Sequence, residues 1–329
     1  MNQVLVLGSS GFSGASFCAW LMDQGIDVVG ASRSMPAADV MLPYRWGKKP
    51  GAFRFEHIDL NKDLDKLFEV IHKERFKVIV NFAAQSMVGE SWDMPDDWMQ
   101  TNVVTAARLA ERLRHLDFLD RYVHVTTPEV YGSTDGWIDE NTRFNPSTPY
   151  AVSRAAGDML FKIYHEAYGL PVVSTRAANV YGPGQQLYRI IPRTIFFLLT
   201  GRTLQLHGGG LSTRSFIHMD DVSAATWLIA LKGKVGSTYH ISTGQIISIA
   251  DLVKAICISL EKNFEDHVEI IEERLGKDNA YWLNCEKLRF ELGWTDKVSL
   301  DTGLSQMREW ISANVDSLAL QPIAYVHKP

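Results

Sequence analysis

The sequence contains few cysteines. Only Cys18, Cys257 and Cys285 occur among its 329 residues, and no two of them form a Cys-x-x-Cys pair. An odd number of cysteines at wide spacings excludes a disulfide framework and a zinc ribbon, because both need closely spaced pairs. We therefore expect three buried thiols and a reducing compartment, the cytoplasm.

Long apolar runs and an excess of one charge are absent as well. No stretch approaches the roughly 18 consecutive apolar residues of a membrane span, and the apolar run at 4–7 lacks the basic flank of a signal peptide. The 33 Lys and Arg residues against 38 Asp and Glu give a net charge of −5. This balance disfavours a nucleic acid or an anionic membrane as a partner.

The spacing of residues excludes two further kinds of catalytic motif. His165-Glu166 is followed by Gly169 where a zinc-binding helix needs a second histidine. Neither Gly8 nor Gly11 begins a Gly-x-Ser-x-Gly elbow. We expect no metal site and no acyl-enzyme.

What the sequence does contain is core material in a regular pattern: 46% of its residues are hydrophobic and 22% are charged. Apolar, β-rich runs at 4–7, 27–31, 53–58, 78–82, 122–126 and 172–175 alternate with amphipathic stretches at 13–24, 63–73, 96–114 and 151–168. Runs buried on both faces are typical of parallel strands that are joined by helices. The pattern predicts a doubly wound α/β (Rossmann) sheet.

The rhythm of the chain changes after Gly182-Pro183-Gly184. We expect a dinucleotide-binding domain over residues 1–180 and a smaller α/β carboxyl-terminal substrate domain over 181–329. A helix pattern at 220–231 and a strand pattern at 237–242 still suit the first domain. We therefore expect segments near 215–245 to return to the first domain and pack there.

A glycine-rich turn stands between the first predicted strand and the first predicted helix. It reads Gly8-Ser9-Ser10-Gly11-Phe12-Ser13-Gly14. Glycine lets a pyrophosphate approach the backbone, and the helix that follows presents free N–H groups and a positive dipole end. The turn predicts dinucleotide binding, with contacts from Gly8, Ser10, Gly11, Phe12 and Gly14.

The position at which an acidic residue would hold the adenosine ribose reads Ala31-Ser32-Arg33-Ser34. Arg33 suits a 2′-phosphate and favours NADP over NAD, although it also fits a solvated side chain after a strand. Asp59-Leu60 follows the third predicted strand. Asp59 either holds the adenine amino group or caps the next helix.

Tyr150 and Arg154 open a predicted helix four residues apart, so they share one face. A cation there stabilises the phenolate and lowers the pKa of Tyr150 toward working pH. The pair alone is common on solvated helices. The hypothesis of catalysis gains support from Thr127 and Glu129, which follow the fifth strand at the edge where such sheets bind ligands.

Several short motifs then follow in order: Asn81-Phe82-Ala83-Ala84-Gln85-Ser86, Asn102, Val130-Tyr131-Gly132, Pro149-Tyr150, the ten residues 176–185 and Arg214. Together with the glycine turn, and over essentially the whole chain, they resemble an extended short-chain dehydrogenase/reductase. The resemblance is to the branch of NAD(P)-dependent nucleotide-sugar epimerases and dehydratases.

The resemblance implies that Tyr150 takes the proton of the sugar 4-hydroxyl as hydride passes to the nicotinamide, with Thr127 bound to the same oxygen. It implies coenzyme contacts for Leu60, Ala83, Tyr150 and Arg154, and nucleotide-diphosphate sugar contacts for Gln85, Asn179, Arg214 and Arg274. The helices at 96–114 and 151–168 would pair in a homodimer.

Two residues depart from the family pattern. Arg154 stands where the family has lysine, which keeps the charge but cannot relay a proton. Pro128 stands between Thr127 and Glu129 where 4,6-dehydratases of this branch have Asp or Ser. Glu129 would then act alone, removing the C5 proton and passing it to the departing 6-hydroxyl, unless it caps a nearby loop.

The sequence leaves three hypotheses of function. The first is a 4,6-dehydratase that oxidises C4, eliminates water across C5 and C6, and returns the hydride. The second is a nucleotide-sugar 4-epimerase, and the third is a catalytically weak homologue that binds nucleotide sugars. Glu129 separates the first two, because an epimerase takes no C5 proton.

Overall fold

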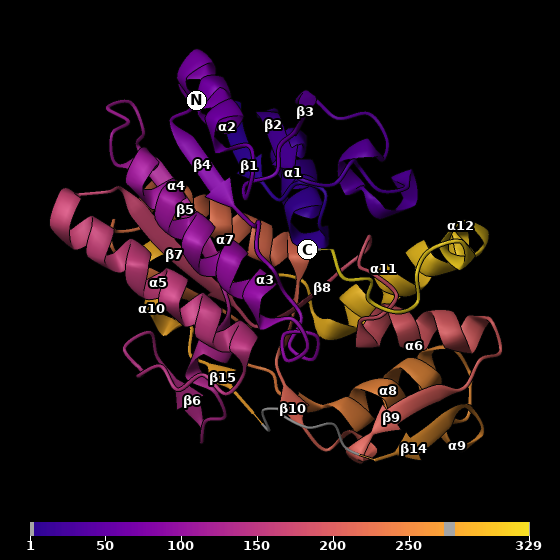
Figure 1. Ribbon diagram of the computed structural model, residues 1–329. Helices are drawn as coiled ribbons and strands as arrows, with labels where there is room; N and C mark the ends of the chain where they lie inside the picture. Colours follow the sequence, from indigo (N-terminus) through magenta and orange to yellow (C-terminus); the bar gives the residue numbers. More distant parts are fainter. Residues whose placement is uncertain (1–2, 273–279, 329) are drawn as a thin grey trace.

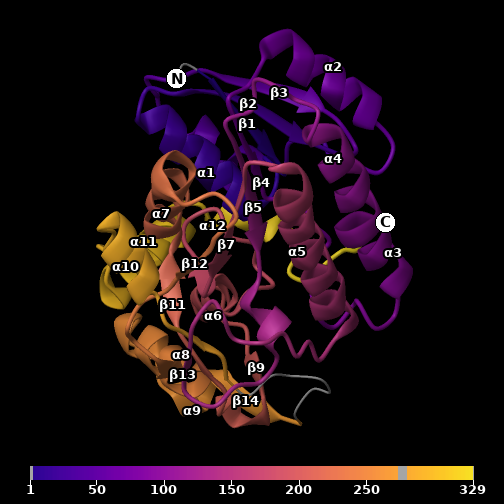
Figure 2. The ribbon, with the colours of Figure 1, turned by 90° about the vertical axis from the view of Figure 1, so that its left-hand side faces the viewer.

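The computed structural model describes residues 3–272 and 280–328. Its centre is a seven-stranded parallel sheet in the order β12-β7-β5-β4-β1-β2-β3 (Figures 1 and 2). The strands are β1 (Gln3–Leu7), β2 (Asp27–Ser32), β3 (Phe53–His57), β4 (Val78–Asn81), β5 (Arg121–Thr126), β7 (Val172–Ala177) and β12 (Thr238–Ile241). The predicted strands are confirmed, with ends that differ by one or two residues.

Helices cover both faces of this sheet. One face carries α1 (Phe12–Asp23) and α7 (Met219–Lys232), and the other carries α2 (Leu64–Glu74), α4 (Ala106–Leu113) and α5 (Pro149–Tyr168). Strand β1 shows why: Val4 and Val6 belong to the core on the first face, whereas Leu5 and Leu7 belong to the core on the second. Successive side chains point to opposite faces of a strand, so a continuous apolar run is buried twice.

The helix predicted at 96–114 is one continuous helical segment in which a π-helical stretch separates two α-helical parts. It comprises α3 (Pro95–Met99), a π-helical stretch over Gln100–Thr105 and α4. Within this stretch Asn102 donates to the carbonyl of Gln85 and to the hydroxyl of Ser153, each at 2.9 Å. A π-turn often serves to aim a side chain, and here it joins the loop after β4 to α5.

The chain after residue 181 builds a second, smaller core. It contains α6 (Ile190–Leu199), β9 (Leu204–His207), α8 (Ile249–Ser259), α9 (Phe264–His267), β14 (Val268–Ile271), α11 (Leu300–Ala313) and α12 (Val315–Ala319). The apolar residues Ile195, Phe196, Phe197 and Leu198 of α6 pack into this core. Two-residue and three-residue strands complete the fold: β6 (Trp137–Ile138), β8 (Asn179–Tyr181), β10 (Thr213–Arg214), β11 (Phe216–His218), β13 (Ile247–Ser248) and β15 (Trp282–Leu283). Short helical turns lie at Asp39–Met41, Pro43–Arg45, Pro128–Tyr131 and Gly208–Gly210.

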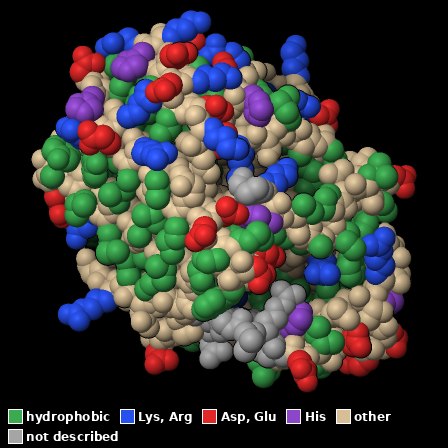
Figure 3. Space-filling view, viewed as in Figure 1, with side chains coloured by type: hydrophobic (Ala, Val, Ile, Leu, Met, Phe, Trp, Pro, Cys, Tyr) green, Lys and Arg blue, Asp and Glu red, His purple; other side chains and the backbone are tan. Residues whose placement is uncertain are grey.

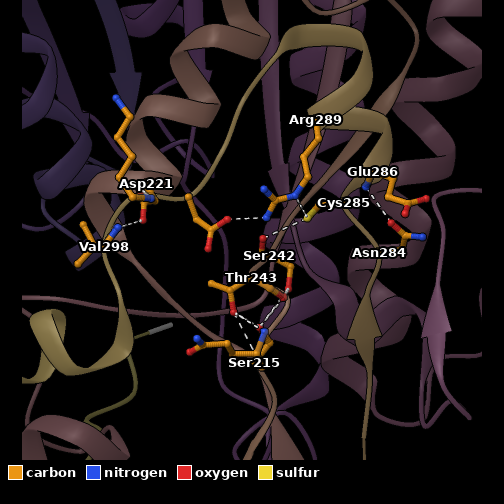
Figure 4. Close-up of polar contacts among 12 residues, drawn as sticks. Ser215, Asp221, Ser242, Thr243, Asn284, Cys285, Glu286, Arg289 and Val298 are labelled. Atoms are coloured by element: carbon orange, nitrogen blue, oxygen red, sulfur yellow. Dashed lines mark hydrogen bonds and ion pairs between the residues drawn. The ribbon is translucent and has the colours of Figure 1, made fainter.

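The helix α10 (Glu286–Leu292) returns to the first core and is fastened there by polar contacts (Figure 4). The thiol of Cys285 donates to the carbonyl of Ser242 at 3.2 Å, just after β12. The carboxylate of Asp221 on α7 accepts the backbone N–H groups of Lys297 and Val298, each at 2.9 Å. The chain thus crosses between its two cores more than once.

Cys18, Cys257 and Cys285 are free and buried, as predicted. Burial raises the pKa of the Cys18 thiol far above its ordinary value. In the described part of the chain, no helix combines the length and the apolar character needed to cross a membrane.

Candidate active site

One large cavity, of about 910 Å³, opens where the parallel strands end. Its wall contains the loops that follow β1, β2, β4, β5 and β7, which is where open parallel sheets bind ligands. The sequence-predicted residues on this wall are Gly8, Ser10, Gly11, Phe12, Gly14, Arg33, Asp59, Leu60, Ala83, Thr127, Glu129, Tyr150, Arg154, Asn179 and Arg214. The fold therefore brings these fifteen residues of the two predicted sites to one place.

The glycine turn has the shape of a dinucleotide cradle. Gly8 has a φ of +83°, and a Cβ there would lie 2.6 Å from the backbone nitrogen of Ala83. A Cβ on Gly14 would lie 2.2 Å from the carbonyl oxygen of Gly8. Gly11, the N-cap of α1, faces the cavity, and the first turn of that helix contains no acidic residue. These features fit a pyrophosphate at the helix N-terminus.

The residues predicted to hold the adenosine have contacts of their own. The backbone N–H of Ser10 donates to the Ser32 hydroxyl at 2.9 Å, and the Arg33 guanidinium donates to the carbonyl of Lys328 at 2.6 Å. Asp59 accepts the backbone N–H of Asn61 at 2.9 Å, and Asp63 rather than Asp59 is the N-cap of α2. The capping alternative for Asp59 is therefore wrong.

Tyr150 lies in the first turn of α5, whose N-cap is Thr148. Burial raises the pKa of Tyr150, and the charge of Glu129 raises it as well. The charge of Arg154 and a hydrogen bond from Thr127 lower it. Arg154 thus acts in the predicted direction, but the predicted net lowering is wrong, because desolvation of the phenolate outweighs the attraction.

The side chain of Arg154 is buried and hydrogen-bonded. It is 5% exposed, and its guanidinium donates to the carbonyl of Val125 on β5. A small second cavity under the active site is also lined by Arg154, together with His124 and Gly157. The guanidinium therefore stands between the sheet edge and the large cavity, with its charge beside Tyr150.

The local fold explains why a proline occupies position 128. The Thr127 hydroxyl accepts the backbone N–H of Glu129 at 3.3 Å and caps a short helical turn over Pro128–Tyr131. Proline suits the first position of such a turn, because its φ is already helical and no N–H is needed there. The turn places Glu129 on the cavity wall, close to Tyr150.

The far end of the cavity is formed by the second part of the chain. The Arg214 guanidinium lies over the Tyr281 ring at 4.8 Å, and the Tyr281 hydroxyl donates to the side-chain oxygen of Asn179 at 3.3 Å. Sequence reasoning missed Tyr281, because no repeated pattern marks the segment around it. Arg274 lies outside the described residues.

Gln85 is the one described site candidate that is not on the cavity wall. It is 2% exposed, and its amide donates to the carbonyl of Lys328 at 2.7 Å. The same carbonyl accepts from Arg33. Lys328 itself lines the cavity, and sequence reasoning missed it because it stands 240 or more positions away from both donors.

The described residues contain no group of His, Cys, Asp or Glu side chains that would hold a metal ion. The residues predicted to be catalytic, Tyr150, Thr127 and Glu129, all lie on the cavity wall, with the buried cation of Arg154 beside Tyr150.

Residues 5–307 match the sequence model of the GDP-mannose 4,6 dehydratase family. The chain is 30% identical to dTDP-glucose 4,6-dehydratase of Haemophilus influenzae, over 96% of this chain and 100% of that protein. It is also 32% identical to a trifunctional UDP-glucose 4,6-dehydratase, epimerase and reductase of Arabidopsis thaliana, over 80% of this chain but 40% of that protein.

Solved structures of nucleotide-sugar dehydratases and epimerases resemble this fold. A dTDP-glucose 4,6-dehydratase from Streptomyces venezuelae, with NAD and TYD bound, has a TM-score of 0.88 at 32% identity and covers 96% of this chain and 99% of its own. A UDP-glucuronic acid 4-epimerase from Bacillus cereus, with UDP-glucuronic acid and NAD, has a TM-score of 0.84 at 26% identity, over 94% of this chain and 99% of its own.

Proposed function

The chain belongs to the GDP-mannose 4,6 dehydratase family, and we propose that Tyr150, Thr127, Arg154 and Glu129 catalyse nucleotide-sugar 4,6-dehydration in its cavity. The observation that carries this proposal is the position of Glu129. Its carboxylate lies on the same wall as Tyr150 and close enough for its charge to raise the pKa of that phenol. An elimination needs such a second acid–base group, whereas a simple C4 oxidation does not.

The chain's own residues divide the work as follows. Tyr150 takes the proton of the sugar 4-hydroxyl, and Arg154 and Thr127 stabilise its phenolate. The bound nicotinamide supplies a reversible hydride acceptor. Glu129 removes the C5 proton, which the C4 ketone makes acidic, and donates it to the departing 6-hydroxyl. Pro128 has no acid group, so one carboxylate performs both transfers.

A panel of nucleotide sugars with mass-spectrometric detection of the loss of one water tests this function. With the substrate that responds, Glu129→Gln should still oxidise C4 but should stop before water leaves. The absorbance band of reduced nicotinamide should accumulate, without a 4-keto-6-deoxy product.

The matched control is Glu90→Gln, a second carboxylate on the cavity wall, which should release water at the parental rate. A Glu129→Gln protein that still forms the 4-keto-6-deoxy sugar would refute the assigned base. If Glu129→Gln instead interconverts two sugars at the parental rate, the protein is a 4-epimerase, the alternative that Pro128 and the epimerase neighbours favour.

We infer that the nucleoside diphosphate of the substrate binds at Asn179, Arg214 and Tyr281. A buried guanidinium beside a cavity suits a diphosphate, because its forked donors match phosphate oxygens. The proposed division of labour is a coenzyme-binding part over residues 1–180 and a substrate-binding part beyond residue 180, with the Tyr150 phenol between them.

We infer further that the protein binds NADP at least as tightly as NAD. Support comes from Arg33, which follows β2 on the cavity wall where no carboxylate stands. A charge-assisted contact to a 2′-phosphate contributes about 1.5 to 3 kcal/mol, or roughly tenfold to a hundredfold in affinity. Calorimetric titration should show that Arg33→Ala weakens the binding of NADP by that factor more than it weakens the binding of NAD. Tighter binding of NAD by the parent protein would contradict this proposal.

A homodimer and a cytoplasmic location complete the proposal. The homodimer is supported by exposed apolar side chains on the outer face of the sheet helices, among them Val152, Met159 and Ile163 of α5. Figure 3 shows hydrophobic side chains gathered over α4 and α5, on the left of the view. The cytoplasm is supported by the three free thiols.

A further inference from the structure

The segment Tyr325–Lys328 crosses from the second part of the chain to the first. Both ribbon views show the C-terminal end beside α3, on the first part, whereas α12 lies on the second (Figures 1 and 2). Ile323, before this segment, still packs on the second core. Along the way Tyr325 meets Tyr188 of the second part edge to face, with ring centroids 5.7 Å apart.

The segment is docked along one side. Tyr325 and His327 are half-buried, whereas Val326 and Lys328 are exposed. This alternation with a period of two is typical of an extended segment that lies against a surface. Val326 is 61% exposed and serves below as a control within the same four residues.

His327 is the anchor on the first part. Its ring stacks on Trp98 of α3 at 5.0 Å and an interplanar angle of 12°, and Trp98 is fully buried. Its Nε2 lies 2.7 Å from a carboxylate oxygen of Asp97. A ring stack and a hydrogen bond to a carboxylate hold one side chain more firmly than either contact alone.

Lys328 then reaches the coenzyme cradle. Its carbonyl accepts from the Arg33 guanidinium at 2.6 Å and from the Gln85 amide at 2.7 Å. Its ammonium group lies 3.4 Å from the hydroxyl of Ser34, and the Ser34 carbonyl accepts from the Ser10 hydroxyl of the glycine turn at 3.3 Å. One carbonyl group thus ties together the loops that follow β2 and β4, at the end of the cavity where the adenosine is proposed to bind.

We propose that the segment Tyr325–Lys328 is a strap across the mouth of the coenzyme site that holds the dinucleotide in place during turnover. The proposal rests on the coenzyme-dependent function proposed above. A 4,6-dehydratase must keep its reduced coenzyme until the hydride is returned, so slow release serves the reaction. Arg33 and Gln85 bind the strap, and the strap then closes over the turn that receives the pyrophosphate.

The test measures the release of coenzyme without any sugar nucleotide. Protein loaded with NADH is mixed with excess NAD, and the loss of bound NADH fluorescence gives the dissociation rate. A chain that stops after Ala324 should release NADH at least about tenfold faster, because it loses charge-assisted and aromatic contacts together. His327→Ala should release it severalfold faster, and Val326→Ala at the parental rate.

A second measurement reports on the strap itself. The backbone amides of Tyr325–Lys328 should exchange hydrogen more slowly when NADH is bound, and thermal unfolding should show that the shortened chain remains folded. Equal NADH dissociation rates for the full and shortened chains overturn the strap while leaving the dehydratase proposal intact. A full chain that binds neither NADH nor NADPH overturns both.

Discussion

A single phenol, Tyr150, is subject to opposing electrostatic influences within the cavity. Burial and the Glu129 carboxylate raise its pKa, and Arg154 and Thr127 lower it. Its position in the first turn of α5 adds the positive end of the helix dipole, which favours the phenolate. Arg154, Thr127 and the helix start therefore oppose the effect of burial, which still leaves the pKa of Tyr150 above its ordinary value.

Replacing this phenol should remove proton transfer and little else. In Tyr150→Phe the ring and its packing remain, so sugar-nucleotide binding should be nearly unchanged while the rate of hydride transfer falls by about 10² to 10⁴. Single-turnover absorbance of reduced nicotinamide measures the rate, and calorimetry measures binding. Retained turnover would make Tyr150 an ordinary helix-start residue.

Behind the cavity a buried polar chain runs across the sheet. Arg176 donates to Asp158 at 2.7 Å and to the Tyr131 hydroxyl at 2.6 Å, and that hydroxyl donates to Nε2 of His240 at 2.8 Å. The Nδ1 of His240 lies 3.1 Å from the carbonyl of Asn284. Although burial raises the pKa of Asp158, Arg176 and His124 hold it well below the ordinary value.

His240 should make the stability of the protein depend on pH. Burial and the charge of Arg176 lower its pKa from 6.5 to about 3. Because the pKa of His240 is lower in the folded state than in the unfolded state, acidification protonates the unfolded chain first. The contribution of His240 to stability is therefore fully present above pH 6.5 and is lost as the pH falls toward 3. The linkage amounts to about 2 kcal/mol between pH 7 and pH 5.

Urea unfolding at these two pH values measures the effect. His240→Asn keeps a donor for the Asn284 carbonyl and has no titrating ring, so its stability should fall less on acidification. His115→Asn, at an exposed side chain, should keep the parental pH dependence. Equal pH dependence in all three proteins would show that His240 titrates normally.

At the scale of elements, the turn from β1 into α1 has two kinds of glycine. Gly14 is structural, because any Cβ there would collide with the Gly8 carbonyl. Gly11 has a φ of −84°, and a Cβ there would be 3.5 Å from the nearest atom, the same carbonyl. The fold therefore leaves room for a side chain at Gly11, which lies on the cavity wall.

The two alanine variants should separate these roles. Gly11→Ala should keep the melting temperature and weaken NAD binding at least about tenfold, because the methyl group keeps the phosphates from the backbone. Gly14→Ala should lower the melting temperature as well as the affinity. Thermal unfolding and calorimetric titration distinguish them. Unchanged affinity in Gly11→Ala would mean that the coenzyme does not bind at this turn.

The helix α5 presents different side chains to different surroundings along its length. Its first turn presents Tyr150, its second turn presents Arg154, and its outer face presents Met159 and Ile163, which are each 53% exposed. An amphipathic helix normally directs such side chains inward. Their exposure supports the proposed homodimer.

At the scale of the whole molecule, the apolar face of α5 should decide the oligomeric state. Ile163→Glu places a charge in the proposed interface between two copies, where its desolvation is unfavourable. Light scattering on a size-exclusion column should show a dimer for the parent and a monomer for this variant. Ile258→Glu, at an exposed position of α8, should remain dimeric. A monomeric parent would refute the homodimer.

Much of this protein follows from its sequence alone. The alternation of apolar runs and amphipathic stretches determined the parallel sheet and its two helical layers, because periodicity is a local property of the chain. The order of parallel strands also places Thr127, Glu129 and Arg33 at one edge, since each follows a strand. The glycine turn and the pair Tyr150 and Arg154 are local signals of the same kind.

Only the tertiary structure decided the rest. Tyr281 joins Asn179 and Arg214, and Lys328 joins Arg33 and Gln85, through contacts that no local pattern encodes. The pKa of Tyr150 likewise depends on desolvation, which exists only after distant segments pack around it. Local periodicity specifies the elements, whereas proximity and burial arise from how the two parts of the chain close on each other.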